Sequence, residues 1–429
     1  MISMRKVAKR VLPDPVVKWI RKRRAAPKEN VRRVKVSRPR FDRWEPSVDH
    51  IIGMEVMLFS TGSDSYAEKL ATSLRSVTAG SDAHIRGALA LARWGFYQGR
   101  PDDALRYLDE VEPLDRALRR AVDLCRVDCL CDMRDGQAAL SLLSKMIGRP
   151  TRDKNHVLRV GHARSLVDGL ADHGSGSMVE ALNTIYHGAG FGLLRRTLVI
   201  APIGLGHISC EVPYAEPSES LPKVTVVVRV PDGSTDIVGI SSLVRQSWRN
   251  LEILVVAGAE ERDHISALDP ALLDDDRVGF VDDTFDSDHP LMPALTYGTG
   301  ELMTTHAPYS WAHPQRIEAQ ASSLMFDPDL RGSISSHMHV ADRLLPRPLG
   351  LVPKEDLVGP NPYSVMLRQS GAATDELLAE FDRIQANHSP VTGELRMLEG
   401  MDLVNDDVPL TLSNAKLAPA TTADRALSS

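Results

Sequence analysis

Two pairs of histidines have spacings that could bring imidazoles together around a metal ion. His337 and His339 are two residues apart, and residues i and i+2 of an extended strand share a face. His306 and His313 are seven residues apart across a predicted turn. Neutral imidazole is a common metal ligand, but histidines at such positions more often cap, pack or lie on the surface. We therefore favour capping or packing for His306 and His313, and a surface pair for His337 and His339, over a metal site.

A cluster of acids offers oxygen ligands instead. Asp282, Asp283, Asp286 and Asp288 follow a predicted short strand. Carboxylate oxygens are the ligands that hard cations such as Mg²⁺ prefer. The cluster falls in a predicted loop, where solvated acids are ordinary, so a metal role is again the less favoured interpretation.

The cysteines indicate a reducing compartment rather than a zinc site. None of them has CxxC spacing, and no histidine lies at zinc-ligand spacing from them. We expect buried thiols at Cys125, Cys129, Cys131 and Cys210.

The charge of the chain is unevenly distributed. The net charge is -6 over 429 residues, yet residues 1–43 hold 16 basic and three acidic side chains, a net +13 against -19 for the rest. Such a leader would be attracted to an anionic membrane surface or to nucleic acid, or would serve as a solubilising tail. We expect no nucleic-acid partner.

The sequence has no run of about 18 apolar residues and no signal-peptide core, which predicts a cytoplasmic protein, peripheral at the inner face of the membrane if the leader binds there.

The stretch Tyr66–Leu194 has the apolar spacing of helices. Ala104-Leu105 and Ala139-Leu140 begin similar helices 35 positions apart, close to the roughly 34-residue tetratricopeptide period. Stacked hairpins of this kind present a groove for protein partners. A plain helical bundle without a groove is the alternative.

The second half alternates strands with helices. Val224–Val230, Leu251–Val256 and Val278–Val281 read as buried strands, with helices predicted near Ile237–Gln246 and His264–Leu273. This order predicts a parallel sheet that binds its ligand at the carboxyl ends of the strands. The resulting organisation is a basic leader (1–47), a helical region (48–200), a linker (201–222), an α/β domain (223–415) and a disordered tail (416–429).

Four stretches of the α/β region carry a family resemblance. They are Val224–Val228 with Ser242–Val256, then Gly300–Leu302, Trp311–Gln320 and Asn361–Arg368. In this order they resemble family 2 glycosyltransferases of the GT-A fold: the first strand and "SLLxQT(Y/W)xNLE" helix, the "GEY" before the metal-binding strand, the "WxHPxRIExQ" helix and the "NPSSLMFR" acceptor-side strand. The resemblance extends from about Pro222 to about Leu412. It implies a mixed-sheet, nucleotide-diphospho-sugar transferase-like domain.

The resemblance also locates the donor site, and there the sequence departs from the family. The family moves a sugar from a nucleotide diphosphate, whose charge a bound Mg²⁺ or Mn²⁺ usually neutralises. The donor-binding positions by resemblance are Val228, Arg229, Ala257, Gly258, Ala307 and Tyr309. Where the family usually has Asp-Asp after the second strand, this chain has Ala257-Gly258. Where the family has Asp-x-Asp-Asp, this chain has Ala-Pro-Tyr-Ser from Ala307, so we expect no metal site despite the metal used by the family.

A transferase also needs a catalytic base to deprotonate the acceptor hydroxyl. By resemblance, an acidic "ADSEF"-like element should lie near Asn387–Leu395. Without a gap its aspartate becomes Ser389; with a short insertion it becomes Thr392, and Glu394 is kept. Glu394 is therefore the one base that we nominate.

Two functions remain open from the sequence. One is a pseudo-transferase or scaffold in cell-surface or capsular polysaccharide assembly, which binds a glycan or a partner enzyme. The other is an active, metal-independent glycosyltransferase with a nucleotide-sugar donor, in which basic side chains neutralise the diphosphate. Arg229, Arg245, Arg316 and Arg368 are the candidates for that task. The loss of every acidic position together favours the first function.

Overall fold

The structure of the chain is a computed structural model. It describes residues 46–414 except 62, 113–114, 147–152, 169–175, 198–203, 213–220, 235, 283–288, 290, 341–343, 345, 348–356, 370–377, 380, 383–387, 390–393 and 396–400. The basic leader, the tail and most of the Asp282–Asp288 cluster lie outside the described residues. None of the helices in the described part combines the length and apolarity that a bilayer crossing requires.

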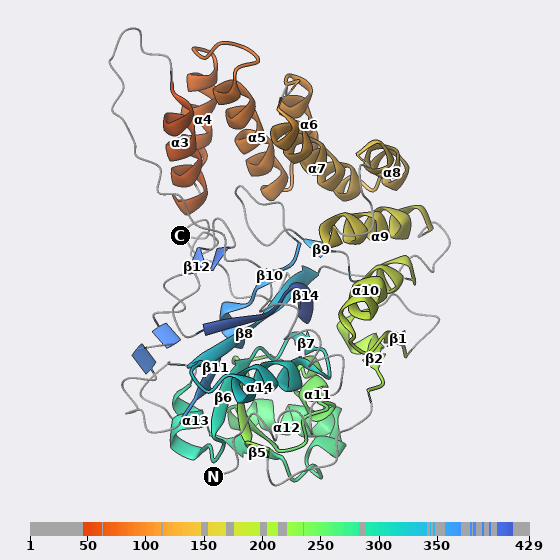
Figure 1. The fold of residues 1–429 in the computed structure, drawn as a ribbon, viewed down its shortest axis with the longest axis vertical. Coiled ribbons are helices and arrows are strands. Elements are labelled where there is room, and N and C mark those ends of the chain that lie inside the picture. The colour runs from red at the N-terminus through yellow and green to blue at the C-terminus, as the bar shows by residue number, and fades with distance from the viewer. Residues whose placement is uncertain are drawn as a thin grey trace. The chain divides into compact units, whose positions relative to one another are not determined.

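The chain divides into two compact units, each described here by itself. The first is all-helical and ends at Met146; the second begins at Ile147 and holds the mixed sheet. The expected order of a helical region followed by an α/β region is therefore confirmed (Figure 1). The grouping differs from the boundary that we expected near residue 200, because the last two helices before the sheet belong to the sheet's unit.

The first unit consists of helices that pack as neighbours along the chain. They are α3 (Val48–Thr61), α4 (Asp64–Leu74), α5 (Asp82–Tyr97), α6 (Pro101–Asp109), α7 (Arg116–Asp132) and α8 (Gly136–Lys145). Their apolar faces, among them Ala88, Leu89 and Ala104, form a common core that runs from α5 to α7. A period of 3.6 residues places these side chains on one face of each helix.

Two matching turns support the repeat that the sequence predicts. Gly99 between α5 and α6 has φ 70°, and Arg134 between α7 and α8, at the same offset in the next hairpin, has φ 63°. Both residues end a helix in the left-handed conformation, which glycine adopts without strain and arginine does not. Asp135 then caps α8 by accepting the Ala138 N–H at 2.9 Å.

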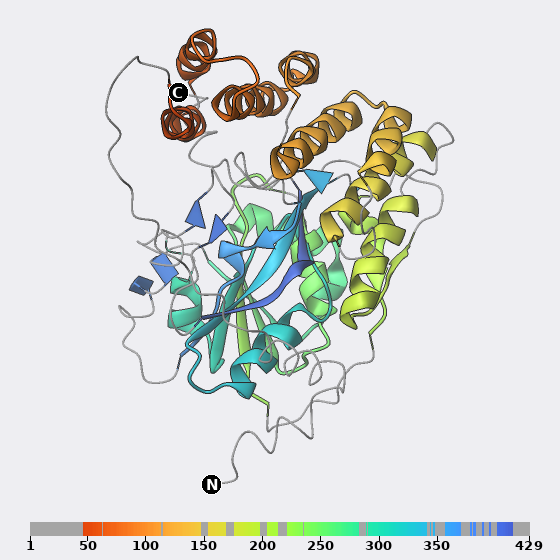
Figure 2. The same cartoon turned by 45° about the horizontal axis from the view of Figure 1, so that its top comes forward.

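Two helices of the second unit, α9 (Lys154–Asp168) and α10 (Gly176–Ala189), lie side by side next to the sheet (Figure 2). The buried Tyr186 hydroxyl of α10 donates to the Pro409 carbonyl at 2.6 Å. The segment that we expected to be a linker contains β2 (Ile208–Cys210), which pairs antiparallel with β1 (Leu194–Arg196). Long-range bonds of this kind attach the helices to the sheet.

The large sheet has a parallel half and an antiparallel half. Its order is β5-β4-β3-β6-β11-β8-β14-β7, with β9 and β10 also paired to β8. Strands β5 to β6 in this order run parallel, β11 is antiparallel to both its neighbours, and β14 runs parallel to β8. The bounds are β3 (Val224–Arg229), β4 (Leu251–Val256), β5 (Val278–Val281), β6 (Leu302–His306), β7 (Ser310–Ala312), β8 (Gly332–Val340), β9 (Pro346–Arg347), β10 (Gly359–Pro360), β11 (Met366–Arg368) and β14 (Met401–Asn414). A separate pair joins β12 (His388–Ser389) to β13 (Glu394–Leu395).

Helices cover both faces of this sheet. Apolar residues of α11 (Val238–Val244), α12 (Ala259–Leu268) and α14 (Arg316–Phe326) share one core with Val226 and Val228. Val227 faces the opposite core, where α13 (Met292–Tyr297) packs. Alternation along β3 thus buries both faces of the strand, as its continuous β-branched run predicts.

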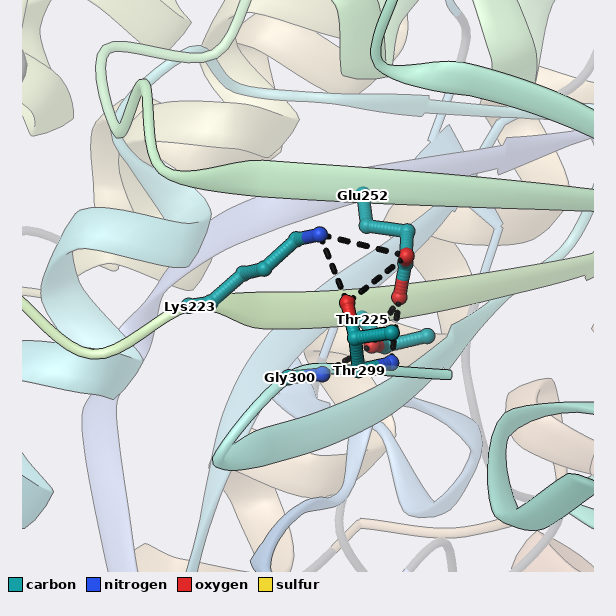
Figure 3. Close-up of polar contacts among 5 residues, drawn as sticks. All are labelled: Lys223, Thr225, Glu252, Thr299 and Gly300. Atoms are coloured by element: carbon teal, nitrogen blue, oxygen red, sulfur yellow. Dashed lines mark hydrogen bonds and ion pairs between the residues drawn. The ribbon is translucent and has the colours of Figure 1, made fainter. Parts of the chain in front are cut away.

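The amino-terminal edge of the parallel strands is fastened by a carboxylate (Figure 3). Glu252 accepts hydrogen bonds from the Thr225 hydroxyl at 2.6 Å and from the Thr299 N–H at 2.8 Å, and pairs with Lys223 at 3.2 Å. The Thr225 oxygen in turn accepts the Gly300 N–H at 3.0 Å. Burial opposes ionisation of Glu252, but these donors outweigh it and lower its pKa. The network fixes the turn that leads into β6.

Candidate functional site

The register of the sheet brings the ends of three parallel strands to one level. Val228 pairs with His306, and Arg229 pairs with Val256. Ala257 and Ala307 follow directly, so the predicted donor-binding positions gather at the carboxyl edge of β3, β4 and β6. This is the edge at which open α/β sheets bind ligands.

An acid, Glu261, lies near the turn after β4, although not at the Ala257-Gly258 position where the resemblance would place acids. Ala257 is fully buried, and its N–H donates to the Val281 carbonyl at 3.1 Å. Glu261, on the first turn of α12, accepts the Gly233 N–H at 2.8 Å, which lowers its pKa. A Cβ on Gly258 would lie 2.6 Å from a Glu261 carboxylate oxygen. Glu261 therefore holds the turn after β3, and sequence reasoning missed it because it lies four residues beyond the expected position.

The loop after β6 is pinned against helix α11. The Gly239 N–H donates to the Pro308 carbonyl at 2.7 Å, and the Ser310 N–H donates to the Ala307 carbonyl at 3.1 Å. A Cβ on Gly239 would lie 2.4 Å from the Ala307 oxygen. The carbonyl oxygens of Ala307 and Pro308 thus both accept backbone N–H groups. The close approach of α11 to this loop requires glycine at position 239.

A buried arginine and histidine lie directly beneath this loop. Arg316 Nη1 is 2.7 Å from His306 Nδ1, and His306 Nε2 is 2.9 Å from the Ser310 carbonyl. Because arginine can only donate, His306 Nδ1 accepts and its Nε2–H donates to Ser310. Burial, followed by the nearby guanidinium, lowers the His306 pKa to about 3, so the ring is neutral.

The other partners of Arg316 are also neutral. Its guanidinium donates to the Thr304 hydroxyl at 3.2 Å, the Thr305 carbonyl at 3.0 Å and the Gln320 amide oxygen at 3.1 Å. The side chain is fully buried, and burial lowers its pKa to about 9. Among the described residues, no carboxylate pairs with it. Arg316 is therefore an uncompensated positive charge, and only the His306 ring separates it from the Ala307–Ser310 loop.

The residues present here do not fit the divalent cation that the family resemblance implies. Ala307 and Pro308 offer no side-chain ligand, both ring nitrogens of His306 are engaged, and the Arg316 cation repels a second cation. Within the described ranges, no group of three or more His, Cys, Asp or Glu side chains could hold a metal ion. No step of a metal-assisted reaction can be derived from these residues.

Tyrosines occur on two neighbouring segments of the site, the loop after β6 and the turn before β11. Tyr309 occupies the second acidic position of the family pattern, and burial, then the neighbouring Tyr363, raises its pKa. Tyr363 lies in the 3₁₀ turn Pro362–Ser364 before β11, where its carbonyl accepts the Thr305 hydroxyl at 2.5 Å. Its side chain is half exposed. Tyr363 was not among the predicted site residues, since only the β11–β6 pairing brings it here.

His313 serves the packing of the sheet rather than a metal site. Its Nε2 is 3.0 Å from the Gly192 carbonyl and 3.6 Å from Cys210 Sγ, and its ring lies 4.8 Å from that of Tyr186. Its Nδ1 accepts the Gln315 N–H at 3.2 Å. Burial lowers the His313 pKa to about 4. The structural interpretation that we favoured for His306 and His313 agrees with these contacts.

The remaining candidates fall elsewhere. The rings of His337 and His339 lie 4.9 Å apart on β8, so they share a face as expected of an extended strand. His337 is buried and His339 partly buried, so the expected surface pair was wrong. Of the acidic cluster, only Asp282 is described, and it pairs with Arg262. Glu394 lies on β13, opposite Ser389, but its side chain is outside the described part, so its role as a base stays a prediction.

The four arginines proposed to neutralise a diphosphate do not converge. Arg229 ends β3 at the site, and Arg316 is buried beneath it. Arg368 pairs with Leu302 at the start of β6, at the opposite edge, and donates to carbonyls of α14 and of the following turn. Arg245 follows the last residue of α11 and is exposed.

Comparison with known proteins gives little further guidance. No family model and no curated protein matches this chain. Among solved structures, it is similar to the mannosyltransferase PcManGT from Pyrobaculum calidifontis in complex with GDP-Man and Mn²⁺, at 14% identity and a TM-score of 0.29. The match covers 47% of this chain and 59% of that protein, so the chain spans less than two thirds of its length.

Proposed function

We propose that this chain is a glycosyltransferase-like protein of the GT-A type that has lost metal-dependent sugar transfer. It acts as a pseudo-transferase or scaffold in the assembly of cell-surface or capsular polysaccharide. The four family-like stretches support the relationship, because they fall in the expected order along the fold. They cover part of α11 with β4, the entry to β6, the end of β7 with the start of α14, and the turn that leads into β11. The observed strand order, with a parallel half next to an antiparallel half, supports the same relationship.

One observation carries the functional half of the proposal. The buried Arg316 cation, its neutral partner His306 and the pinned loop occupy the place where a transferase of this type needs carboxylates. The His306 ring separates Arg316 from the loop, with contacts of 2.7 Å on one side and 2.9 Å on the other. At an effective dielectric of about 20, two unit charges about 8 Å apart repel by roughly 2 kcal/mol, and a divalent cation doubles this. Among the residues that the structure describes, no acid at this position offsets this repulsion.

Isothermal calorimetry with UDP-glucose and GDP-mannose, each with and without Mn²⁺, tests the proposal. We expect no Mn²⁺-dependent heat of donor binding and no release of free sugar from either donor. Micromolar, Mn²⁺-dependent binding followed by donor hydrolysis would overturn it. Hydrolysis that is indifferent to chelator would instead support the active, metal-independent transferase, the alternative that the scattered arginines disfavour.

The helical unit supplies the scaffold half of the proposal. The helix hairpins α5–α6 and α7–α8, with their matching turns, resemble the repeats that bind protein partners through a groove. We propose a partner enzyme of the same assembly as their target. The basic leader would add attraction to anionic lipid. Co-sedimentation of the full-length and the leader-deleted protein with anionic vesicles measures this attraction.

A further inference from the structure

Helix α3, the first of the helical unit that the structure describes, has an exposed apolar face. Ile52, Val56 and Met57 are 38%, 45% and 41% exposed, while the opposite side of the helix packs against α4 and α5. The terminal helices of a stacked array normally have a polar outer face, because no further repeat covers them. The apolar composition of this face therefore indicates that another segment covers it.

A glycine lies among these side chains. Gly53 is about one helical turn from Val56 and Met57, and a Cβ at this position would meet nothing within 4 Å. Glycine inside a helix lowers its stability relative to alanine. Close approach of another backbone is a reason to keep it there, since a missing side chain leaves room for one. Ile52, Gly53, Val56 and Met57 are called the α3 face below.

The small size of the α3 face indicates where its occupant comes from. Stable interfaces between separate proteins bury about 800 Å² on each partner, and three partly exposed side chains offer only a fraction of that area. A segment of the same chain needs less area, because a short connection raises its local concentration to about the millimolar range. The size of the face thus favours an occupant from this chain over a second copy.

The leader contains a segment of matching character shortly before α3. Residues 14–24, which lie outside the described part, begin with Asp-Pro, a typical start of a helix. Val16, Trp19 and Ile20 follow at spacings of three and four, which would place them on one face of that helix. Residues 25–47 connect the segment to α3, and a random chain of that length spans on average roughly 25 Å. This distance is comparable to the length of α3, about 21 Å at 1.5 Å per residue.

The charges of the two segments are complementary. Residues 14–24 hold five basic side chains and one acidic side chain. Helices α3 and α4 together hold four acidic side chains and one basic side chain: Asp49, Glu55, Asp64, Glu68 and Lys69. Glu55 is buried and paired with Arg93, whereas Asp49 and Glu68 are exposed. Opposite charges of this kind favour encounter and orient the approaching segment.

We propose that residues 14–24 dock on the α3 face and cap the helical unit. Val16, Trp19 and Ile20 then cover the apolar side chains of the α3 face, and the two backbones approach at Gly53. The inference goes beyond the proposed function, because it does not depend on the sugar-transfer site. It also sets docking in competition with the lipid attraction of the leader, since one apolar face cannot be buried in both places.

Photo-crosslinking of the full-length protein without lipid tests this inference. Benzoyl-phenylalanine is placed at position 52, where the native side chain is exposed, and mass spectrometry identifies the captured peptide. We expect capture within residues 14–24 in a cross-linked monomer. Val16→Asp combined with Trp19→Asp should lower the capture about fivefold or more, whereas Trp19→Phe, which keeps an aromatic ring, should stay within about twofold.

Two further variants make the test specific. Gly53→Leu should also lower the capture about fivefold, because the added side chain blocks close approach while meeting no neighbour in the folded unit. Benzoyl-phenylalanine at position 133 is the matched control and should not capture residues 14–24. Met133 is 42% exposed in the same unit, but it follows α7 and lies outside the α3 face.

Several results would overturn the inference. A cross-linked dimer would mean that the α3 face joins two copies of the chain. Absence of capture, capture undiminished by the two aspartates, or equal capture from position 133 would each show that residues 14–24 have no specific site on α3. Vesicle binding that requires Val16 and Trp19, together with no capture from position 52, would assign the segment to lipid instead.

Discussion

Two of the buried histidines of the second unit, His306 and His313, should make its stability depend on pH in a specific way. The folded pKa is about 3 for His306 and about 4 for His313, in both cases chiefly because burial disfavours the charged ring. In the unfolded chain a histidine titrates near 6.5. Between these values the unfolded state binds two protons that the folded state does not. A group with a lowered folded pKa contributes stability above its unfolded pKa and loses it as the pH falls.

The magnitude follows from proton linkage. Each extra proton bound by the unfolded state changes the free energy of unfolding by about 1.4 kcal/mol per pH unit, so two histidines together give at most about 2.7 kcal/mol per unit. Lowering the pH from 6 to 5 should therefore remove about 2 kcal/mol from the second unit. His306→Gln should remove about half of this slope, since an amide can accept from Arg316 and donate to Ser310 without titrating.

Urea unfolding at pH 7, 6 and 5, followed by the fluorescence of Trp248 and Trp311, measures the slope. Both tryptophans are buried in the second unit. His187→Gln, an exposed position of α10, is the matched control and should keep the parental slope. An identical pH slope for His306→Gln and the parent would refute the assignment of a buried neutral ring to His306.

Four further predictions concern single features. Glu252→Gln should destabilise the second unit by about 1–3 kcal/mol at pH 7, and by less below pH 4, because the ionised carboxylate with its lowered pKa is the favoured form; chemical denaturation at both pH values measures this. Arg134→Gly should stabilise the helical unit by about 0.5–1 kcal/mol, seen as a higher Tm, by relieving a left-handed arginine. Burial raises the pKa of Glu55 to about 7, against the opposing effect of Arg93. The folded state therefore loses stability as the pH rises through 7. Glu55→Gln should raise the Tm of the helical unit at pH 8 and change it little at pH 5. Ala307→Asp combined with Tyr309→Asp should not restore Mn²⁺ binding by calorimetry, because Arg316 remains beneath the loop; restored micromolar affinity would contradict that reasoning.

Local sequence patterns predicted the parallel half of the sheet closely. The runs Leu251–Val256 and Val278–Val281 are strands with the expected bounds, because continuous apolar, largely β-branched segments of this length favour buried strands. The helix expected near His264–Leu273 begins earlier, at Ala259, and ends at Leu268. Acidic residues at its start suit the positive end of a helix dipole, a signal that the apolar spacing alone does not give.

The antiparallel half could not be predicted in the same way. Strand β8 buries Ser333, Ser335 and Ser336, residues that pattern reasoning assigns to loops. Their burial is tolerated because partners distant in sequence satisfy some of them: Ser333 donates to the Gln320 carbonyl and Ser335 bonds to Ser364. Strand β14 pairs with both β8 and β7, and no local signal specifies such pairings.

The candidate site shows the same division. The absence of acids at Ala257, Gly258, Ala307 and Tyr309 was readable from the sequence, because the family pattern fixes where they should be. The buried charge of Arg316 was not, since a sequence pattern predicts arginine on a surface or beside an acid. Only the fold reveals that neutral hydrogen-bond acceptors surround it.

The central claim is that a buried arginine and a pinned loop exclude the divalent cation from the carboxyl edge of the sheet. Electron paramagnetic resonance of Mn²⁺ tests it most directly, by measuring free Mn²⁺ in titrations of the full-length protein with and without GDP or UDP. The account predicts that adding protein leaves the free Mn²⁺ signal at the level set by the nucleotide alone. A protein-dependent loss of that signal with micromolar affinity, abolished by a substitution at the carboxyl edge of β3, β4 or β6, would contradict it.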